Sequence, residues 1–370
     1  MKDILVIGGG KIGSVVAGLL VNTPESNGYR VTVADRSATL LAQLTPGGNP
    51  RLNTLVLDVT DPARLRDALQ GRFAVLSAAP YHLTLQVAQA ARDAGVHYLD
   101  LTEDVASTRA IRTLAEGATT AFIPQCGLAP GFISIVAADL ARRFDSLDSV
   151  RMRVGALPAY PSNALNYNLT WSTEGVINEY CEPCEAIVDG RPCVVPALEE
   201  REEFSLDGVL YEAFNTSGGL GTLCETLAGK VRTLNYRTIR YPGHAAIMKA
   251  LLNDLRLRDR RELLKDILVQ ALPTTMQDVV IVFVTVAGLR GGRLQQETYA
   301  RKIYSQVLAG QMRSAIQITT ASSLCAMLDL LAAGELPQHG FVRQEEVPLA
   351  AFLGNRFGQV YAAEPLAHAA

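Results

Sequence analysis

A glycine-rich motif directly behind the first short apolar segment constrains the fold of this chain most strongly. Ile4–Ile7 is expected to be a strand, and Gly8, Gly10 and Gly13 follow it in the spacing G-x-G-x-x-G. In this pattern the first glycine permits a tight turn and the second lets the backbone approach a pyrophosphate. The third lets the next helix pack closely on the strand. The motif therefore predicts a dinucleotide-binding βαβ unit.

The residues around the motif are expected to complete the dinucleotide site. Lys11 and Ile12 open the helix whose N-terminal amides would hold the phosphates. The second expected strand, Arg30–Ala34, is followed by Asp35, about 20 residues after the motif, where a carboxylate binds the adenosine ribose. This acid favours NAD because it repels the additional phosphate of NADP. Arg36 could pair with that phosphate or stack on the adenine, so NADP is not excluded.

Further cofactor contacts are expected where the parallel strands end, because ligands of such sheets bind outside their carboxyl ends. Asp58 and Val59 follow the third expected strand, Leu55–Leu57, and Asp58 either contacts the adenine or caps its own loop. The fourth expected strand, Phe73–Ser77, is followed by small residues against which a nicotinamide ring can lie. These residues are Ala78, Ala79 and Pro80.

The periodicity of the chain changes after the first third. Strands and amphipathic helices alternate up to about residue 125, which predicts an α/β Rossmann domain with a doubly wound parallel sheet. From Val150 onward longer strands with hairpin signals predict an inserted α+β domain on a mixed, largely antiparallel sheet. One such hairpin joins Val279–Ala287 to Glu297–Ser305 through the turn Gly288–Arg293.

The last apolar segment, Ile318–Ala333, is expected to be a helix that packs back on the first domain. The predicted dinucleotide-binding domain therefore consists of residues 1–127 and 318–370. Residues 128–317 are expected to form the substrate-binding and dimerisation domain.

Composition excludes several other classes of protein. The 34 Lys and Arg residues are dispersed among 37 Asp and Glu residues, which argues against a nucleic-acid-binding protein. The N-terminal apolar run is too short for a signal peptide, and Val279–Leu289 is too short to span a membrane. We expect a cytoplasmic protein with six reduced cysteines. Cys181 and Cys184 have the spacing of a metal pair but only Cys193 lies nearby, so no metal site is assigned.

Two carboxylates follow the fifth expected strand, His97–Leu101, and are candidates for proton transfer. Asp100 lies at the strand end and Glu103 lies in the loop behind it. Either could remove a proton from a substrate ammonium before hydride leaves the adjacent carbon. Asp100 is the first candidate, with a structural role weighted equally, and Glu103 is the second, with a solvated helix start as its alternative.

Candidate substrate contacts occur in four further segments. Tyr81 follows the fourth strand, and Cys126 and Gly127 follow the sixth, Ala121–Pro124. The alternative role of Cys126 is that of a small buried apolar residue. Thr216 and Ser217 belong to a polar glycine-rich loop that either binds an anion or forms a turn. Arg240 and His244 flank a tight turn; the arginine suits a carboxylate but could instead bridge the domains. The histidine has a helix cap or a satisfied interior histidine as its alternatives.

Four motifs beyond the glycine fingerprint carry a resemblance that extends over nearly the whole chain. They are the loop Gly127–Gly131, the stretch Asn166–Gly175, the loop Asn215–Gly219 and the segment Tyr236–His244. In these motifs the chain resembles the saccharopine dehydrogenase-like family, and within it the lysine 6-dehydrogenases. The loop reads Gly-Leu-Ala-Pro-Gly with Ala129, where saccharopine-forming members typically carry aspartate.

The resemblance implies a homodimer that uses NAD, or else NADP, on a small amino-acid substrate. The expected activity is oxidation of L-lysine at its ε-carbon. The alternatives are a saccharopine dehydrogenase or a carboxynorspermidine-type dehydrogenase acting on a secondary amine, and a non-catalytic NAD(P)-binding sensor. The resemblance also places an acidic residue near the nicotinamide at the position of Asp100.

Overall fold

The computed structural model describes residues 1–22, 28–44, 48–308 and 310–362. The chain forms two compact units. Unit 1 consists of Met1–Phe132 with the described part of Gln317–Ala370, and unit 2 consists of Ile133–Ile316. The divisions therefore fall after residues 132 and 316, where the sequence placed them after 127 and 317.

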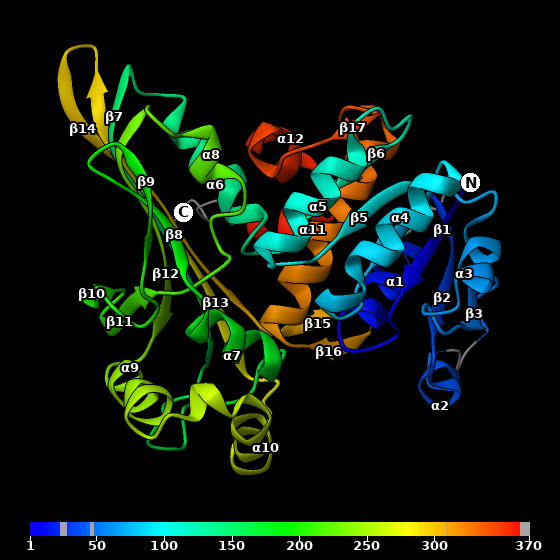
Figure 1. Ribbon diagram of the computed structural model, residues 1–370, viewed down its shortest axis with the longest axis horizontal. Coiled ribbons are helices and arrows are strands. Elements are labelled where there is room, and N and C mark those ends of the chain that lie inside the picture. Colours follow the sequence, from blue (N-terminus) through cyan, green and yellow to red (C-terminus); the bar gives the residue numbers. More distant parts are fainter. Residues whose placement is uncertain (23–27, 45–47, 309, 363–370) are drawn as a thin grey trace, which may run out of the picture. The chain divides into compact units, whose positions relative to one another are not determined.

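Unit 1 is built on a seven-stranded parallel sheet with the order β17-β6-β5-β4-β1-β2-β3 (Figure 1). The order reverses between β1 and β4, which is the switch point where a doubly wound fold binds its ligand. The predicted Rossmann fold is therefore confirmed. The strands are β1 (Lys2–Ile7), β2 (Tyr29–Asp35), β3 (Leu52–Val56), β4 (Ala74–Ser77), β5 (His97–Asp100), β6 (Ala121–Ile123) and β17 (Gly340–Phe341).

Helices cover this sheet on both faces. Leu5 and Val75 point to one face, where they join a core with Leu65 of α3, Val87 of α4 and Ile111 of α5. The other face is covered by α1 and α11 (Figure 1). The helices of unit 1 are α1 (Gly13–Asn22), α2 (Ala38–Ala42), α3 (Pro62–Leu69), α4 (Thr84–Ala94), α5 (Val105–Ala115) and α12 (Leu349–Gly354), and α11 (Ala315–Ala332) enters from unit 2.

The apolar helix α11 packs on unit 1, as the sequence predicted. Its Asp329 carboxylate accepts hydrogen bonds from the Tyr29 hydroxyl at 2.7 Å and from Asn355 at 2.9 Å, and it pairs with Arg356 at 2.8 Å. The helix is long and apolar enough to cross a membrane by length and composition, but 78% of it is buried within the protein. These contacts are those of a core helix.

Unit 2 is built on a mixed eight-stranded sheet. Its main path is β10-β11-β12-β7-β13-β14, with β8 paired to β12 and β9 to β8. Only the β12–β7 pair is parallel among these ladders, so the predicted largely antiparallel sheet is confirmed. The strands are β7 (Ser146–Pro158), β8 (Cys184–Val188), β9 (Arg191–Val195), β10 (Glu202–Leu206), β11 (Val209–Asn215), β12 (Val231–Arg240), β13 (Asp278–Arg290) and β14 (Arg293–Tyr304).

The β13–β14 hairpin is longer than the sequence predicted (Figure 1). Its ladder continues to the pair Arg290–Arg293, so the turn contains only Gly291 and Gly292. Both glycines have positive φ angles, +56° and +74°. Two consecutive residues of this kind form the turn that matches the twist of the strands, so pairing reaches the turn itself.

Helices and loops of unit 2 form a second core beside the sheet. It contains Tyr167, Tyr180 and Phe214 together with apolar residues of three helices. These helices are α7 (Thr173–Cys181), α9 (His244–Lys249) and α10 (Arg261–Ala271).

Candidate active site

The glycine loop after β1 has the close backbone contacts that its motif predicts. Gly8 has φ +95°, and a Cβ atom there would lie 2.8 Å from the Ala78 carbonyl oxygen. A Cβ atom on Gly13 would lie 1.8 Å from the Gly8 carbonyl oxygen. By contrast, a Cβ atom on Gly10 would meet no protein atom within 4 Å. The space above Gly10 is therefore left for a ligand, which fits a dinucleotide pyrophosphate.

Asp35 ends β2 beside this loop. Its carboxylate accepts hydrogen bonds from the backbone N–H groups of Gly9, at 2.9 Å, and Ser37, at 2.8 Å. The acid is thereby fixed at the loop where an adenosine ribose would lie. Arg36 and Lys11 are exposed and Ile12 is half-buried.

The other expected cofactor residues lie on the same edge of the sheet. The Asp58 carboxylate accepts hydrogen bonds from the hydroxyl and the N–H of Thr60, at 2.7 and 2.9 Å. These bonds lower the pKa of Asp58 and make it a loop cap. Val59 is buried. The Ala78 N–H donates to the Ile7 carbonyl at 2.8 Å, which holds the loop of Ala78, Ala79 and Pro80 against the glycine loop.

Asp100 is buried and links two loops of unit 1 through hydrogen bonds. Its side chain is 1% exposed, and its carboxylate accepts hydrogen bonds from the Thr102 N–H at 3.0 Å and the Gln125 N–H at 2.8 Å. The Tyr98 hydroxyl donates a third at 2.8 Å. Burial raises the pKa of Asp100 to about 6, although these donors oppose the shift. The geometry favours the structural alternative, because both oxygens are already bound by the protein.

Glu103 has the properties that Asp100 lacks. It lies half-buried in the loop between β5 and α5. Burial raises the pKa of the Glu103 carboxyl, and the negative charges of Asp104 and Asp100 raise it further. A partly accessible carboxylate with a raised pKa suits proton transfer. Glu103 therefore fits the role of a proton acceptor better than Asp100 in its accessibility.

Three expected substrate residues of unit 1 differ in their accessibility. Tyr81, in the short helix Tyr81–Leu83, is 43% exposed. Cys126 is fully buried, and its sulfur lies 3.0 Å from the Ile123 carbonyl oxygen and 3.3 Å from Nε2 of Gln344. Gly127 is also buried, with its carbonyl accepting the Phe132 N–H. We therefore correct the role of Cys126 to that of a small core residue, since its thiol is enclosed by unit 1.

The loop at Thr216 and Ser217 also differs from the expected anion site. The Thr216 hydroxyl hydrogen-bonds that of Thr238 at 2.7 Å, and the Ser217 hydroxyl donates to the Pro183 carbonyl at 3.0 Å. The Ser217 N–H donates to the Glu179 carbonyl. Because these polar groups are satisfied within unit 2, the loop is better explained as a turn that closes the core.

Arg240 is the most unusual residue of unit 2, because its charged side chain is only 2% exposed. Its Nε atom donates to the Tyr180 hydroxyl at 2.9 Å and its Nη1 atom to the Ile239 carbonyl at 2.9 Å. The guanidinium lies 4.9 Å from the centre of the Tyr167 ring. A buried arginine held in this way can bind a carboxylate in a planar, bidentate arrangement.

His244 is buried, and the Tyr180 hydroxyl lies between it and Arg240. It is 1% exposed, and its Nε2 atom lies 3.0 Å from the Tyr180 hydroxyl. His244 is therefore a hydrogen-bonded interior histidine, the alternative that the sequence left open. No motif in the sequence pointed to Tyr180, whereas Tyr167 belongs to the stretch Asn166–Gly175 that carried the family resemblance.

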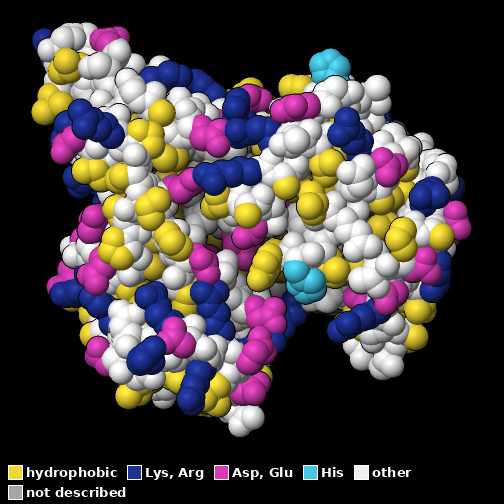
Figure 2. All heavy atoms as spheres, in the orientation of Figure 1, with side chains coloured by type: hydrophobic (Ala, Val, Ile, Leu, Met, Phe, Trp, Pro, Cys, Tyr) yellow, Lys and Arg dark blue, Asp and Glu magenta, His cyan; other side chains and the backbone are white. Residues whose placement is uncertain are grey.

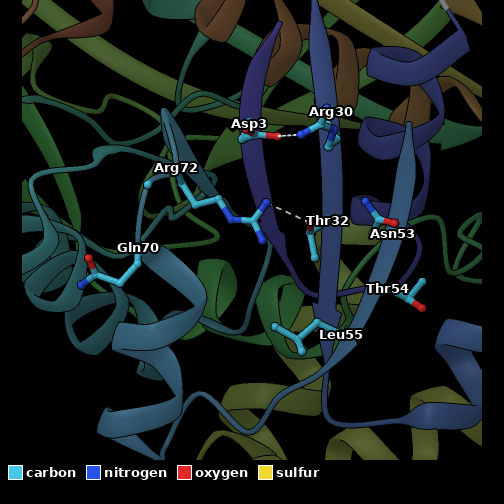
Figure 3. Close-up of a pocket in the computed structure, with 9 residues that line it drawn as sticks. Asp3, Arg30, Thr32, Asn53, Thr54, Leu55, Gln70 and Arg72 are labelled. Atoms are coloured by element: carbon cyan, nitrogen blue, oxygen red, sulfur yellow. Dashed lines mark hydrogen bonds and ion pairs between the residues drawn. The ribbon is translucent and has the colours of Figure 1, made fainter. Parts of the chain in front are cut away.

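A groove of about 440 Å³ lies at the opposite edge of the unit 1 sheet (Figure 3). Arg72 donates to the Thr32 hydroxyl there, and Arg30 pairs with Asp3 at 3.3 Å. Asp3 and Arg30 lie at the amino ends of β1 and β2 and Arg72 precedes β4, so the groove is separate from the glycine loop. Figure 2 shows cationic and anionic side chains interspersed over the visible face. Among the described residues, no group of three His, Cys, Asp or Glu could hold a metal.

Comparison with curated proteins gives partial matches. The chain is 25% identical over 197 residues to mitochondrial alpha-aminoadipic semialdehyde synthase of Mus musculus, covering 51% of this chain and 21% of that protein. The Rattus norvegicus protein matches at 24% identity over the same shares. The chain thus spans about a fifth of the length of these relatives.

Comparison with solved structures supports the fold over the whole chain. Saccharopine dehydrogenase (L-Glu forming) from Saccharomyces cerevisiae matches with a TM-score of 0.77 at 18% identity, covering 93% of this chain and 94% of that one. Homospermidine synthase from Legionella pneumophila, solved with NAD, matches with a TM-score of 0.69 at 13% identity, covering 98% and 90%.

Family models match both units. Residues 4–123 match the saccharopine dehydrogenase NADP binding domain, and residues 127–355 match the saccharopine dehydrogenase C-terminal domain. The glycine loop and Asp35 lie within the first match, and Arg240 lies within the second. The chain belongs to the saccharopine dehydrogenase family of NAD(P)-dependent oxidoreductases.

Proposed function

We propose that this protein oxidises the ε-carbon of L-lysine with NAD to an imine, which water hydrolyses to allysine and ammonia. The aldehyde of allysine then condenses with its own α-amine, losing water, to give 1-piperideine-6-carboxylate. The observation that carries the proposal is the buried Arg240, held by Tyr180 and the Ile239 carbonyl beside the Tyr167 ring. A desolvated guanidinium of this kind suits one carboxylate, and lysine carries one. Ala129, in place of the aspartate typical of saccharopine-forming members, favours the same substrate.

The reaction divides between the protein and the cofactor. Bound NAD would supply the hydride acceptor, and the protein must supply a group that takes a proton from the lysine ammonium. Lysine has an ordinary pKa of about 10.4, so its ε-amine is protonated at neutral pH and has no lone pair to assist hydride departure. Glu103 is assigned as the proton acceptor and Arg240 as the carboxylate anchor. Asp100 fixes the loop that precedes Glu103.

A secondary-amine substrate is the second candidate, and the family match favours it. Saccharopine carries carboxylates on both of its joined amino acids and would need more than one cationic anchor. The discriminating experiment follows the absorbance of the reduced cofactor with lysine or saccharopine and with NAD or NADP. Reduction with lysine and NAD is expected. Turnover of saccharopine alone would move the assignment to the second candidate, and cofactor binding without any turnover would indicate a sensor.

The preference for NAD is expected to depend on Asp35. In Asp35→Ser the ribose hydroxyls lose their carboxylate acceptor and an added phosphate no longer meets a negative charge. The ratio of kcat/KM for NAD to that for NADP should fall about tenfold or more, because a hydrogen bond to a charged group contributes about 1.5–3 kcal/mol. Asp58→Ser serves as a control at the next strand end. An unchanged ratio in Asp35→Ser would contradict the placement of the ribose.

Arg240 is expected to determine the affinity for lysine. Arg240→Lys keeps the charge but loses the planar pair of donors, so the KM for lysine should rise about tenfold to a hundredfold while the KM for NAD stays constant. Steady-state kinetics with each substrate varied would measure this. Equal changes in both constants, or loss of the folded state, would show instead that Arg240 holds unit 2 together.

A homodimer and a cytoplasmic location complete the proposal. The half-buried rings of Phe204 and Phe283 stack at 5.3 Å on the unit 2 sheet, where Leu206 joins the same cluster. Aromatic clusters of this kind are enriched at subunit interfaces. In light scattering, Phe204→Glu should shift a dimer to monomer, whereas Leu263→Glu on α10 should not. The six free cysteines suit a reducing compartment.

A further inference from the structure

Three buried side chains of unit 2 form a continuous chain of hydrogen bonds. Nε of Arg240 lies 2.9 Å from the Tyr180 hydroxyl, which lies 3.0 Å from Nε2 of His244. Nδ1 of His244 lies 2.8 Å from the Leu165 carbonyl oxygen. Tyr180 is fully buried, and Arg240 and His244 are 2% and 1% exposed. Water therefore does not compete for these bonds.

The chemistry of its two ends fixes the direction of this chain. An arginine can only donate, so the Tyr180 oxygen accepts from Nε of Arg240. A carbonyl oxygen can only accept, so Nδ1 of His244 carries a proton and donates to the Leu165 carbonyl. In the neutral ring Nε2 is then an acceptor, and the Tyr180 hydroxyl donates to it.

The surroundings of His244 stabilise this neutral form. Burial lowers the pKa of His244 to about 3, and the positive charge of Arg240 lowers it further, whereas the bond to Leu165 opposes the shift. The ring faces the aromatic rings of Tyr167, Tyr180 and Phe214, with centroids 5.4, 5.8 and 6.3 Å away. A proton on Nε2 would turn this acceptor into a donor and break the bond from Tyr180.

A buried carboxylate holds the turn that carries His244. Glu212 is 1% exposed and accepts hydrogen bonds from the N–H groups of Gly243, at 3.2 Å, and Ala245, at 2.7 Å. Gly243 has φ +97°, a conformation that favours glycine. The backbone on both sides of His244 is therefore fixed, and its ring is held by the bonds of Nε2 to Tyr180 and of Nδ1 to Leu165.

We propose that His244 is a positioning residue that orients the Arg240 guanidinium through Tyr180, so that the remaining N–H groups of the arginine meet one substrate carboxylate. This inference rests on the proposed role of Arg240. The hydrogen bond to Tyr180 fixes the Nε side of the Arg240 guanidinium, and the Ile239 carbonyl fixes one Nη1 hydrogen. The Tyr167 ring packs against the plane of the guanidinium. Glu179, which is itself buried, adds an attractive charge near the arginine.

The test compares two substitutions of the same histidine in the full-length protein. His244→Phe keeps a ring but removes the acceptor for Tyr180, and should raise the KM for lysine about tenfold to a hundredfold with the KM for NAD unchanged. His244→Gln places an amide oxygen near the position of Nε2 and should recover most of the affinity. Tyr180→Phe removes the same link and should resemble His244→Phe, and the double variant should be no worse than either single variant.

A binding readout separates positioning from catalysis. L-Norleucine carries the same head group as lysine but no ε-amine. Its affinity, measured by calorimetry, should fall in His244→Phe by the factor by which the KM for lysine rises.

An unchanged KM for lysine in His244→Phe together with a raised KM in Arg240→Lys would overturn the positioning role alone. Unchanged KM values in both variants would overturn the anchor and thus the proposed function. Equal losses for lysine and NAD that His244→Gln does not recover would indicate a purely structural histidine. His339 is an exposed histidine of unit 1, and His339→Phe is the control for effects of substituting and purifying any such variant.

Discussion

Glu103→Gln is expected to lower kcat for lysine oxidation by about a hundredfold to ten-thousandfold while leaving NAD affinity intact. A positioned general base contributes this much to the rate, and glutamine cannot accept a proton although it has nearly the same shape. Stopped-flow or steady-state kinetics would measure kcat, and fluorescence titration would measure NAD binding. The equal fall of kcat and kcat/KM would show that the lost interaction acts in the transition state.

The pH profile gives an independent signature of the same residue. Glu103 works as a base only when ionised, so activity should fall as the pH drops through the Glu103 pKa. Burial and the charges of Asp104 and Asp100 place that pKa above the ordinary value of 4.5. The acid limb should therefore lie above pH 4.5 in the native protein and disappear in Glu103→Gln. On the alkaline side, rates should rise as the solvent shares in deprotonating lysine.

Two neighbouring carboxylates are matched controls for Glu103. Asp104 caps α5 by accepting the Ser107 N–H at 2.7 Å, and Asp104→Asn should retain turnover because asparagine is also a good cap. Asp100→Asn should lower the midpoint of thermal unfolding, since its amide would meet the Tyr98 hydroxyl. Full activity in Glu103→Gln with lost turnover in a stably folded Asp100→Asn would restore Asp100 as the base.

Gly10→Ala and Gly13→Ala are expected to abolish tight NAD binding for different reasons. A methyl group on Gly10 meets no protein atom within 4 Å, so the free protein should fold and melt as the native protein does. The added methyl group should nevertheless clash with a bound pyrophosphate. NAD affinity should fall about tenfold to a hundredfold for each hydrogen bond lost between the backbone and a phosphate.

A methyl group on Gly13 would instead lie 1.8 Å from the Gly8 carbonyl oxygen, so the loop must move even without ligand. Gly13→Ala should therefore both weaken NAD binding and destabilise the free protein by about 1–3 kcal/mol or more. Calorimetry measures NAD binding and differential scanning fluorimetry measures stability. Gly18→Ala in α1, where a methyl group also meets nothing, is the control. Native NAD affinity in Gly10→Ala would contradict a pyrophosphate at this loop.

The sequence alone determined the fold class and the dinucleotide loop, because both depend on local patterns. Gly8, Gly10 and Gly13 behind one strand and Asp35 behind the next are set by spacing along the chain, and the parallel sheet follows from the alternation of strands and helices. The apolar character of α11 was likewise readable, since a helix buried on most sides carries few charges. The length of the β13–β14 hairpin was missed because it depends on the φ angles of two glycines.

Only the tertiary structure decided which polar side chains are already satisfied inside the protein. Asp100 and Glu103 lie three residues apart in the sequence, yet Asp100 accepts a bond from the distant Gln125 N–H besides those from Tyr98 and Thr102, whereas Glu103 stays half-buried. Cys126 likewise turns into the core beside Gln344, a residue far along the chain. Tyr180 comes to lie between Arg240 and His244 only because α7, about 60 residues earlier in the sequence, packs against the segment that carries both. Hydrogen bonding and burial depend on neighbours in space, which spacing along a single chain does not specify.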